Sequence, residues 1–283
     1  MADYFPAAYV HQHADYNPSN SSDYKLIVLY EDNTLSCSIS NSSGHILALK
    51  EFNAISEEDL PKLIQDQEFL TLPYSSVECI VSDGYFLQTP EDFYKYTSAE
   101  ELLEPLRNPW ELKSEIIQNF LPNGKIITLA QDSDSWVQPF LNPYPSLQKI
   151  HIAHRTLYIA QRQQELENPI YTLMLFALGG KVVFQLFNRA GLVLSQIFPV
   201  KRAEDYLYYA LWVCRELHIS PEHIVIRFAG KAKTQESPFE LLEKYFPEVK
   251  YPDRELTQPW YPTESRIPVL HYLPILPELP SMA

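Results

Sequence analysis

The clearest pattern of apolar and polar positions lies between residues 169 and 230. Four short apolar runs bounded by turn residues occupy residues 170–178, 181–187, 192–198 and 223–229. Before the last of them, apolar residues recur with a helical spacing over residues 203–217. Short bounded runs are typical of strands, and a period near 3.6 residues is typical of a helix. The stretch is therefore predicted to form three strands, a helix and a fourth strand.

A fainter version of the same pattern precedes it, between residues 25 and 81. Its apolar runs occupy residues 25–30, 34–40, 45–52 and 77–81. Between the third and fourth runs, Ser56-Glu57-Glu58-Asp59 is a helix-capping sequence that leads into Leu60, Leu63 and Ile64. The order strand, strand, strand, helix, strand is therefore expected twice in one chain.

A shared turn sequence links the two copies. Aligned without gaps, Asn41 falls on Asn188 and Gly44 on Gly191, so each copy has Asn-x-x-Gly between its second and third strands. Asn opens a type I turn, and Gly in the fourth place adopts a positive φ that closes a bulged hairpin. We interpret the chain as an internal duplication. The alternative is that two unrelated three-strand meanders happen to align.

The predicted order of elements implies a mixed sheet in each copy. A helical crossover is right-handed and returns the fourth strand parallel to the first, which then lies in the middle of the sheet. A central strand is covered on both faces, as expected from the nearly continuous apolar run Tyr171–Leu178. The covering stripe of the following helix is predicted to be Ala203, Leu207, Ala210, Leu211, Cys214 and Leu217.

Four parts of the chain follow from these patterns. Residues 1–23 are polar and are expected to form an irregular arm. Residues 24–167 form a first lobe, which includes several short helices and an inserted hairpin at residues 115–129, with Asn123-Gly124 as its turn. Residues 168–248 form the second lobe. Residues 249–283 are rich in proline, so they are expected to lie extended over the body as a tail.

Composition narrows the class of partner. The formal net charge is −14, and an acidic surface repels phosphate backbones, so we expect no nucleic-acid partner. No run approaches the roughly 18–20 apolar residues of a membrane helix, and no secretory signal is visible at the N-terminus. The three cysteines lie far apart in predicted strands and helices, as buried thiols do in a reducing compartment. A cytoplasmic location is expected.

Several local sequences carry a family resemblance. They are Asn188, the helix sequence Asp205-Tyr206-Leu207-Tyr208-Tyr209, Gly230 after the last strand, and the run from Tyr85 to Glu91 that ends in Thr-Pro-Glu. The repeated unit resembles the ribonuclease-H-like module, and its duplication resembles the actin-like ATPase fold. Over residues 24–275 the chain is similar to an uncharacterised bacterial family of domain-of-unknown-function proteins with that fold. The resemblance implies an α/β fold with mixed sheets and brings no known activity.

The actin-like resemblance implies where ATP and Mg²⁺ would bind. In such proteins, turns of the form Asp-x-Gly supply backbone N–H donors for phosphates and a carboxylate for the metal. Here the first turn contains Asp32 and no glycine, whereas the second contains Gly179 and Gly180 and no carboxylate. The adenosine position reads Ala229-Gly230-Lys231, without the usual paired glycines. If a nucleotide binds, these four residues (Asp32, Gly179, Gly180 and Gly230) are the expected contacts.

A metal-dependent nuclease is a further alternative, because two-metal nucleases need three or four converging carboxylates. Asp32, Asp83 and either Glu58 or Asp59 occupy comparable places in the first copy, but the second copy has no carboxylate at Gly180 or Gly230. We predict that these carboxylates are solvated turn and cap residues.

No other pattern predicts catalysis. His11 and His13 lie in the arm, and His151 and His154 lie at a predicted helix start. Neither pair has the further ligands of a metal site. No nucleophile or Walker sequence is present. We therefore predict neither a catalytic residue nor a resident metal. The hypothesis is a non-catalytic actin-like protein that acts through contacts with an unidentified protein, with a nucleotide-binding weak ATPase and the nuclease as alternatives.

Overall fold

A computed structural model describes residues 5–107, 115–121, 125–132, 135–167, 169–252 and 272–276. The described chain forms two compact units, and each is described here by itself. The first contains the described residues up to His154 together with Ile275 and Leu276. The second contains the described residues from Arg155 to Pro252 together with Tyr272–Pro274. Within the described residues, no helix is both long enough and apolar enough to span a membrane.

The first unit is built on a six-stranded mixed sheet with the order β1-β4-β3-β2-β5-β9. β2 pairs antiparallel with β3 and parallel with β5, so the first strand of the repeat lies inside the sheet as expected. β9 adds a further parallel strand beside β5. The strands are β1 (Tyr9–Gln12), β2 (Lys25–Glu31), β3 (Thr34–Ser40), β4 (Ile46–Asn53), β5 (Ser76–Val81) and β9 (Gln148–His151).

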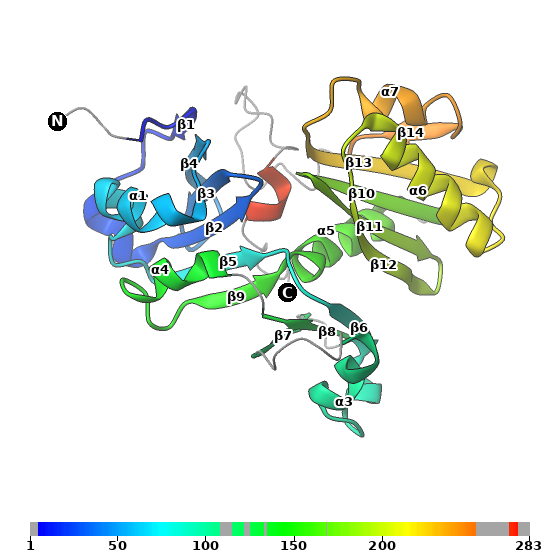
Figure 1. The fold of residues 1–283 in the computed structure, drawn as a ribbon, viewed down its shortest axis with the longest axis horizontal. Helices are drawn as coiled ribbons and strands as arrows, with labels where there is room; N and C mark the ends of the chain where they lie inside the picture. Colours follow the sequence, from blue (N-terminus) through cyan, green and yellow to red (C-terminus); the bar gives the residue numbers. More distant parts are fainter. Residues whose placement is uncertain are drawn as a thin grey trace. The chain divides into compact units, whose positions relative to one another are not determined.

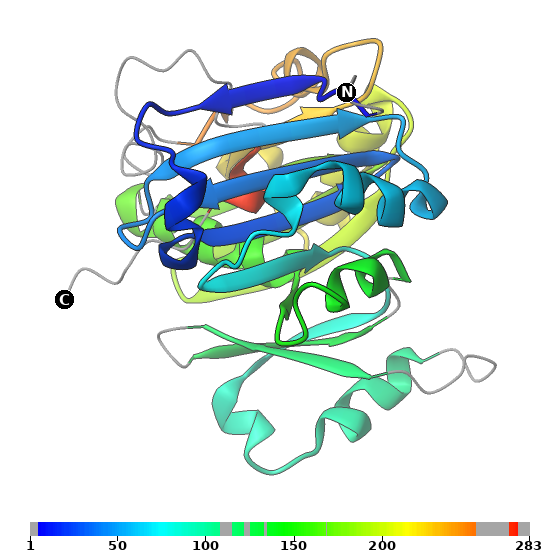
Figure 2. The same ribbon diagram turned by 90° about the vertical axis from the view of Figure 1, so that its left-hand side faces the viewer.

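Short helices cover one face of this sheet. Figure 2 shows α1 (Leu60–Asp66) lying across the strands. Its Leu60, Leu63 and Ile64 are buried in a core that also contains Phe52 and Phe140, the latter from α4 (Gln138–Leu141). The 3₁₀ helices of this region are η1 (Pro18–Asp23), η2 (Glu57–Asp59), η3 (Glu68–Leu70) and η5 (Ser135–Val137).

A small three-stranded sheet is inserted between β5 and β9, with the order β6-β8-β7. Asn119 of β7 attaches it to strand β9 of the larger sheet, and Gln88 of β6 attaches it to the first turn of α5 (Ile152–Glu167). The Gln88 amide donates to the Ala153 carbonyl (2.9 Å), and the Asn119 amide donates to the Lys149 carbonyl (3.1 Å). The elements are β6 (Phe86–Pro90), α2 (Glu91–Tyr94), α3 (Ala99–Leu103), η4 (Glu104–Leu106), β7 (Ile116–Phe120) and β8 (Ile126–Gln131).

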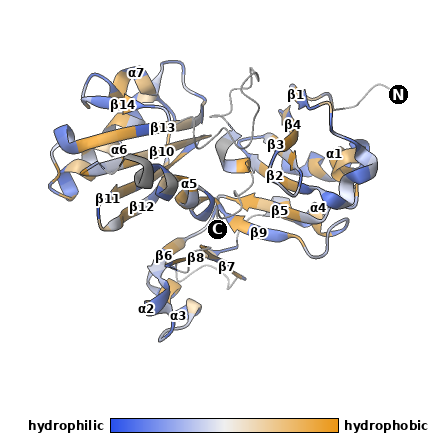
Figure 3. Ribbon diagram, turned by 180° about the vertical axis from the view of Figure 1, so that it is seen from behind, coloured by the Kyte–Doolittle hydropathy of each residue, from blue (hydrophilic) through white to orange (hydrophobic). Residues whose placement is uncertain are grey.

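The second unit contains a five-stranded mixed sheet with the order β12-β11-β10-β13-β14. Its central strand β10 is buried over seven consecutive residues, as the apolar run predicted. Figure 1 shows α6 lying along one face of the sheet, and Figure 3 shows hydrophobic residues along β10 and β13. The elements are β10 (Tyr171–Gly179), β11 (Lys181–Asn188), β12 (Gly191–Pro199), α6 (Ala203–Glu216), η6 (Pro221–His223), β13 (Ile224–Ala232), α7 (Pro238–Leu242) and β14 (Glu248–Lys250). Two further elements, α5 (Ile152–Glu167) and η8 (Leu273–Ile275), contain residues of both units.

The two larger sheets share strand order and hairpin chemistry. Both contain the order third, second, first and fourth strand of the repeat, with the fourth parallel to the first. The side chains of Asn41 and Asn188 accept backbone N–H groups of their turns, and Gly44 and Gly191 have positive φ. The connections differ in length, because Ser40 pairs with Ile46 whereas Asn188 pairs with Gly191. Duplication as the origin of this likeness stays a prediction.

Several expectations need correction. Residues 1–23 were expected to be irregular, but β1 pairs antiparallel with β4 through its backbone, an interaction that its polar sequence does not signal. Gly230 was expected after the last strand and lies inside β13. His151 ends β9, one residue before α5 begins. The tail expected at 249–283 begins within β14. Its residues 253–271 and 277–283 lie outside the described residues, and so does the expected Asn123-Gly124 turn. The predicted lobe boundaries stay predictions.

Candidate functional site

The turn between β2 and β3 consists of only two residues, Asp32 and Asn33. Glu31 pairs directly with Thr34, and both turn residues have a positive φ, 49° and 57°. A two-residue hairpin of type I′ requires positive φ at both positions, and Asp and Asn tolerate it better than other side chains do. The sequence therefore makes the tightest available hairpin here, with no glycine to let a phosphate approach the backbone.

This first turn is tied to the helix region that follows β4. The Asn33 carbonyl accepts the Ile55 N–H at 3.0 Å, and the Tyr30 hydroxyl donates to the Ile55 carbonyl at 2.8 Å. At the ends of β2 and β5, the Ser82 hydroxyl donates to the carboxylate of Glu31. The sequence analysis did not single out Glu31, because its contact with Ser82 depends on the pairing of two strands 51 residues apart.

The carboxylates considered for a nuclease do not form a metal-binding group among the described residues. The Asp59 carboxylate accepts the Ser56 hydroxyl at 2.6 Å in the capping box at the start of η2, and Glu58 is exposed. Among the described residues, which include Asp32 and Asp83, no three His, Cys, Asp or Glu side chains are grouped so that they could hold a metal ion. A two-metal centre needs such a group.

The second turn, between β10 and β11, is formed by Gly179 and Gly180. Leu178 pairs with Lys181, Gly179 has a φ of 59°, and the Val200 N–H donates to the Gly180 carbonyl at 2.8 Å. A Cβ added at Gly180 would meet nothing within 4 Å, so the space beside this residue is open. The turn can therefore present backbone to a ligand, but it has no carboxylate to hold a metal.

Gly230 has a packing role within its own sheet. Its φ is +88°, and it pairs with Ala177 of the neighbouring strand β10. A Cβ added at Gly230 would lie 2.1 Å from the Ala177 carbonyl oxygen and 2.7 Å from the Ala177 nitrogen. The close approach of two backbones therefore accounts for this glycine without any nucleotide.

The predicted nucleotide contacts thus fall into two groups. Gly179, Gly180 and Gly230 gather at the carboxyl ends of β10 and β13, where Gly179 pairs with Ala232. Asp32 lies in the first unit, at the carboxyl end of β2. Mg²⁺ with a nucleotide needs glycine-exposed N–H donors together with a carboxylate. The first turn supplies the carboxylate alone and the second the glycines alone, so neither donor set fits the complete ligand.

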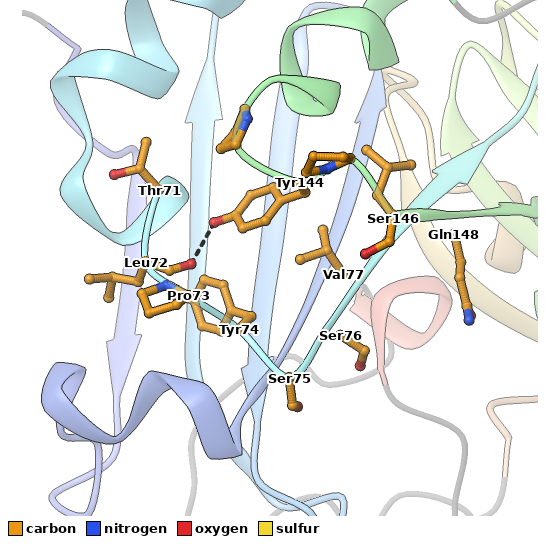
Figure 4. A pocket seen from close by; sticks show the side chains of 13 residues that line it. Thr71, Leu72, Pro73, Tyr74, Ser75, Ser76, Val77, Tyr144, Ser146 and Gln148 are labelled. Carbon is orange, nitrogen blue, oxygen red and sulfur yellow. Dashed lines mark hydrogen bonds between the residues drawn. The ribbon is translucent and has the colours of Figure 1, made fainter.

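A pocket of about 540 Å³ lies in the first unit, at the end of the sheet opposite to the Asp32-Asn33 turn. It is formed by the segments that lead into the parallel strands β5 and β9, whereas Asp32 follows the carboxyl end of their parallel neighbour β2. Figure 4 shows the lining side chains, which are Thr71, Leu72, Pro73, Tyr74, Ser75, Ser76, Val77, Pro143, Tyr144, Pro145, Ser146, Leu147 and Gln148. None of them is charged. Its volume is within the usual range of ligand pockets.

Two tyrosines of the pocket wall donate hydrogen bonds to backbone carbonyls. The Tyr144 hydroxyl donates to the carbonyls of Leu70 (2.9 Å) and Leu72 (3.0 Å), and the latter bond is drawn in Figure 4. The Tyr74 hydroxyl donates to the Phe69 carbonyl at 2.8 Å. Burial raises the pKa of both phenols, so both remain protonated donors at neutral pH. The sequence analysis missed this pocket, whose only local signal is proline beside tyrosine in two distant loops.

Comparison with known proteins identifies the fold. The family described as protein of unknown function (DUF3822) matches residues 13–249. No curated protein matches the chain. A Bacteroides thetaiotaomicron protein with an actin-like ATPase fold and unknown function is 18% identical, with a TM-score of 0.72 over 86% of this chain and 97% of that one. A chain of the PilM-PilN type IV pilus biogenesis complex is 11% identical, with a TM-score of 0.59 over 89% and 94%. The fold is that of the actin-like ATPases.

Proposed function

The chain belongs to DUF3822, a family of unknown function, and on that premise we propose that it acts without nucleotide turnover, through contacts with another protein. The observation that carries this proposal is the division of the phosphate-site chemistry between two incomplete turns. Asp32 stands in a glycine-free hairpin, and Gly179 and Gly180 stand in a hairpin without a carboxylate. An ATPase of this fold would need both chemistries at its phosphate site.

The uncharged pocket beside β5 and β9 is the proposed contact surface. The chain as a whole is strongly acidic, yet none of the pocket's lining residues carries a charge. Its proline and tyrosine rings offer apolar area, and Ser76, Ser146 and Gln148 offer hydrogen-bonding groups. Surfaces of this composition suit an uncharged segment of a partner protein, because no buried charge has to be desolvated.

One structural neighbour supports a role in protein assembly. The similar chain with a TM-score of 0.59 comes from a complex, the PilM-PilN type IV pilus biogenesis complex. That complex illustrates that a chain of this fold can be part of a protein assembly. The partner of the present chain is proposed to be a protein as well, without an inference about pili.

The proposal includes a cytoplasmic location. All three cysteines, Cys37, Cys79 and Cys214, are buried, and burial raises the pKa of Cys214 to about 11, which keeps it a thiol. Buried thiols of this kind are typical of proteins that work in a reducing compartment.

The first arm of the test measures nucleotide binding and hydrolysis. Purified protein is melted with and without ATP or ADP in the presence of Mg²⁺, because a ligand that binds only the folded state raises the melting temperature. A bound ligand at about 100 times its Kd adds about 2.7 kcal/mol to the stability. We expect no shift and no phosphate release. Hydrolysis that requires Mg²⁺ and disappears in Asp32→Ala would contradict the proposal.

The second arm measures protein contacts at the pocket. Tagged protein is cross-linked in lysate, and Ser146→Trp is compared with Ser42→Trp, since Ser146 lines the pocket whereas Ser42 lies in the exposed turn after β3. We expect a captured protein that Ser146→Trp loses by at least about tenfold and Ser42→Trp retains. Equal capture by both variants would exclude the pocket as the contact surface.

A nucleotide-binding, weakly hydrolysing protein is the second candidate function. The observation that favours it is the Gly179-Gly180 turn, where the space beside Gly180 is open to a ligand. In that case ATP or ADP raises the melting temperature in the first arm of the test. For the nuclease, the described residues offer no group of three metal-ligating side chains, and incubation with Mn²⁺ and mixed RNA and DNA substrates tests it directly.

A further inference from the structure

The outer edge of β12 offers backbone hydrogen-bonding groups to a partner strand. β12 is the first strand in the order of the second sheet, and it pairs with β11 on its inner side. In the described part of the chain, no strand pairs with its outer side. An edge strand exposes a row of N–H and C=O groups that can template another strand.

The side chains of β12 do not protect this edge. Its sequence, Gly-Leu-Val-Leu-Ser-Gln-Ile-Phe-Pro, contains no charged residue, and every residue is at least partly exposed. Edge strands are usually blunted by lysine, by proline or by a bulge. Here Pro199 stands at the end of the strand, and the register shift opposite Leu186 and Phe187 lies near its beginning. The segment from Leu194 to Phe198 has none of these features.

In the first unit, the edge that corresponds to β12 is paired with a further strand. β4 takes the place there that β12 takes in the second unit, and its outer side is covered by β1. The pairing is antiparallel, with Val10 opposite Lys50 and His11 opposite Leu49. Most residues of β4 are buried, whereas every residue of β12 is at least partly exposed. An antiparallel strand therefore suits the outer edge of β12.

We propose that the strand at this edge is β12 of a second copy of the chain. A two-fold interface places the same surface on both partners, and pairing of one strand with its own copy across such an axis is antiparallel. Two copies with a net charge of −14 repel each other over most of their surfaces. At β12 two copies can approach without bringing acidic side chains of this strand together, because the strand has no charged residue. The charges nearest its ends, at Arg189, Lys201, Arg202, Glu204, Asp205 and at Lys181 opposite Pro199, do not share the acidic excess of the whole chain, since four of the six are positive.

The expected dimer is weak and depends on concentration. One pair of short strands buries less than the roughly 1,200 Å² of a stable interface, so association in the micromolar range is expected. The inference is independent of the proposed function, because neither the phosphate turns nor the pocket contributes to this edge.

Sedimentation velocity over about 1 to 200 µM protein tests the proposal, a range chosen for a weak interface. The edge variant carries Val193→Lys and Gln196→Lys, two exposed positions of β12. The control carries Tyr208→Lys and Tyr245→Lys, which add the same charge at exposed positions of the same unit. Thermal melting first establishes that both variants are folded.

We expect the wild type and the control to shift toward twice the monomer mass as concentration rises. The edge variant should dimerise at least about tenfold more weakly, since lysines on both copies then face each other. As a second readout, Gln196→Cys should form a disulfide-linked dimer under mild oxidation, and Tyr208→Cys should not. A wild type that stays monomeric throughout, or an edge variant that associates like the wild type, would overturn the proposal.

Discussion

Glycine residues in this chain serve two different purposes, and only their surroundings separate them. Gly230 lies inside β13, where the backbone of Ala177 leaves no room for a side chain. Gly180 lies in a hairpin turn with open space around the position of a Cβ. The sequence analysis grouped both as potential nucleotide contacts because a resemblance to actin-like proteins draws attention to any glycine near these strand ends.

Substitution by alanine should destabilise the protein strongly at Gly230 and hardly at all at Gly180. Gly230→Ala is expected to lower the free energy of unfolding by more than about 3 kcal/mol, because the new methyl group overlaps the Ala177 backbone and the positive φ strains alanine. Gly180→Ala is the matched control and should change stability by less than about 0.5 kcal/mol. Urea unfolding followed by circular dichroism measures both. Similar losses in the two variants would contradict the packing role of Gly230.

At the scale of elements, the start of helix α6 is capped by the side chain of Asp205. The Asp205 carboxylate accepts the backbone N–H groups of Lys201 (2.7 Å) and Arg202 (2.9 Å). These hydrogen bonds, the Lys201 bond foremost, lower the pKa of Asp205. The apolar spacing predicted the buried face of this helix only in part. Tyr206 and Val213 are buried although they were not in the predicted stripe, whereas Leu207, Leu211 and Leu217 of that stripe are only partly buried.

Removing this cap should destabilise the protein in a pH-dependent way. Asp205→Ala is expected to lower the free energy of unfolding by about 1 kcal/mol at pH 7. A lowered pKa in the folded state contributes stability above the ordinary pKa of about 3.9, and that contribution is lost as pH falls through the lowered value.

The difference between wild type and Asp205→Ala should therefore shrink below about pH 4, as measured by urea unfolding at several pH values. Glu204→Ala, one residue earlier and exposed, is the control and should cost less than about 0.5 kcal/mol. A loss for Asp205→Ala that stays constant down to pH 3 would show that the carboxylate charge is not involved.

At the scale of the whole molecule, net charge decides which partners can approach. The chain carries 36 acidic and 22 basic residues and has a calculated isoelectric point near 5.0. Two surfaces differ from this acidic average because their residues carry no charge: the pocket beside β5 and β9, and the strand β12. Both proposals place a protein at a surface where the acidic character of the molecule is absent.

The same charge predicts that nucleic acid does not bind. Fluorescence anisotropy with labelled double-stranded DNA and single-stranded RNA should show no binding up to about 10 µM protein, even at about 50 mM salt, where electrostatic attraction would be strongest. Binding that weakens steeply as salt increases would reveal a basic surface and contradict the prediction.

The two turns that were expected to contact a nucleotide could be located from the sequence, because turn residues between apolar runs mark hairpins locally. Their incomplete chemistry was equally visible, since Asp32 has no glycine beside it and Gly179 and Gly180 have no carboxylate. The pocket could not be found in this way. Its two walls, Thr71–Val77 and Pro143–Gln148, are brought together by the parallel pairing of β5 with β9 across more than 60 residues.

What the sequence determined by itself is the order and kind of the main elements, and through them the α/β fold with mixed sheets. Apolar periodicity is a property of neighbouring residues, so it can be read without knowing the contacts. The tertiary structure alone decided that the polar arm supplies β1, that Gly230 packs inside β13, and which edge of each sheet is covered. These features depend on backbone groups from distant segments, which leave no trace in the local pattern of side chains.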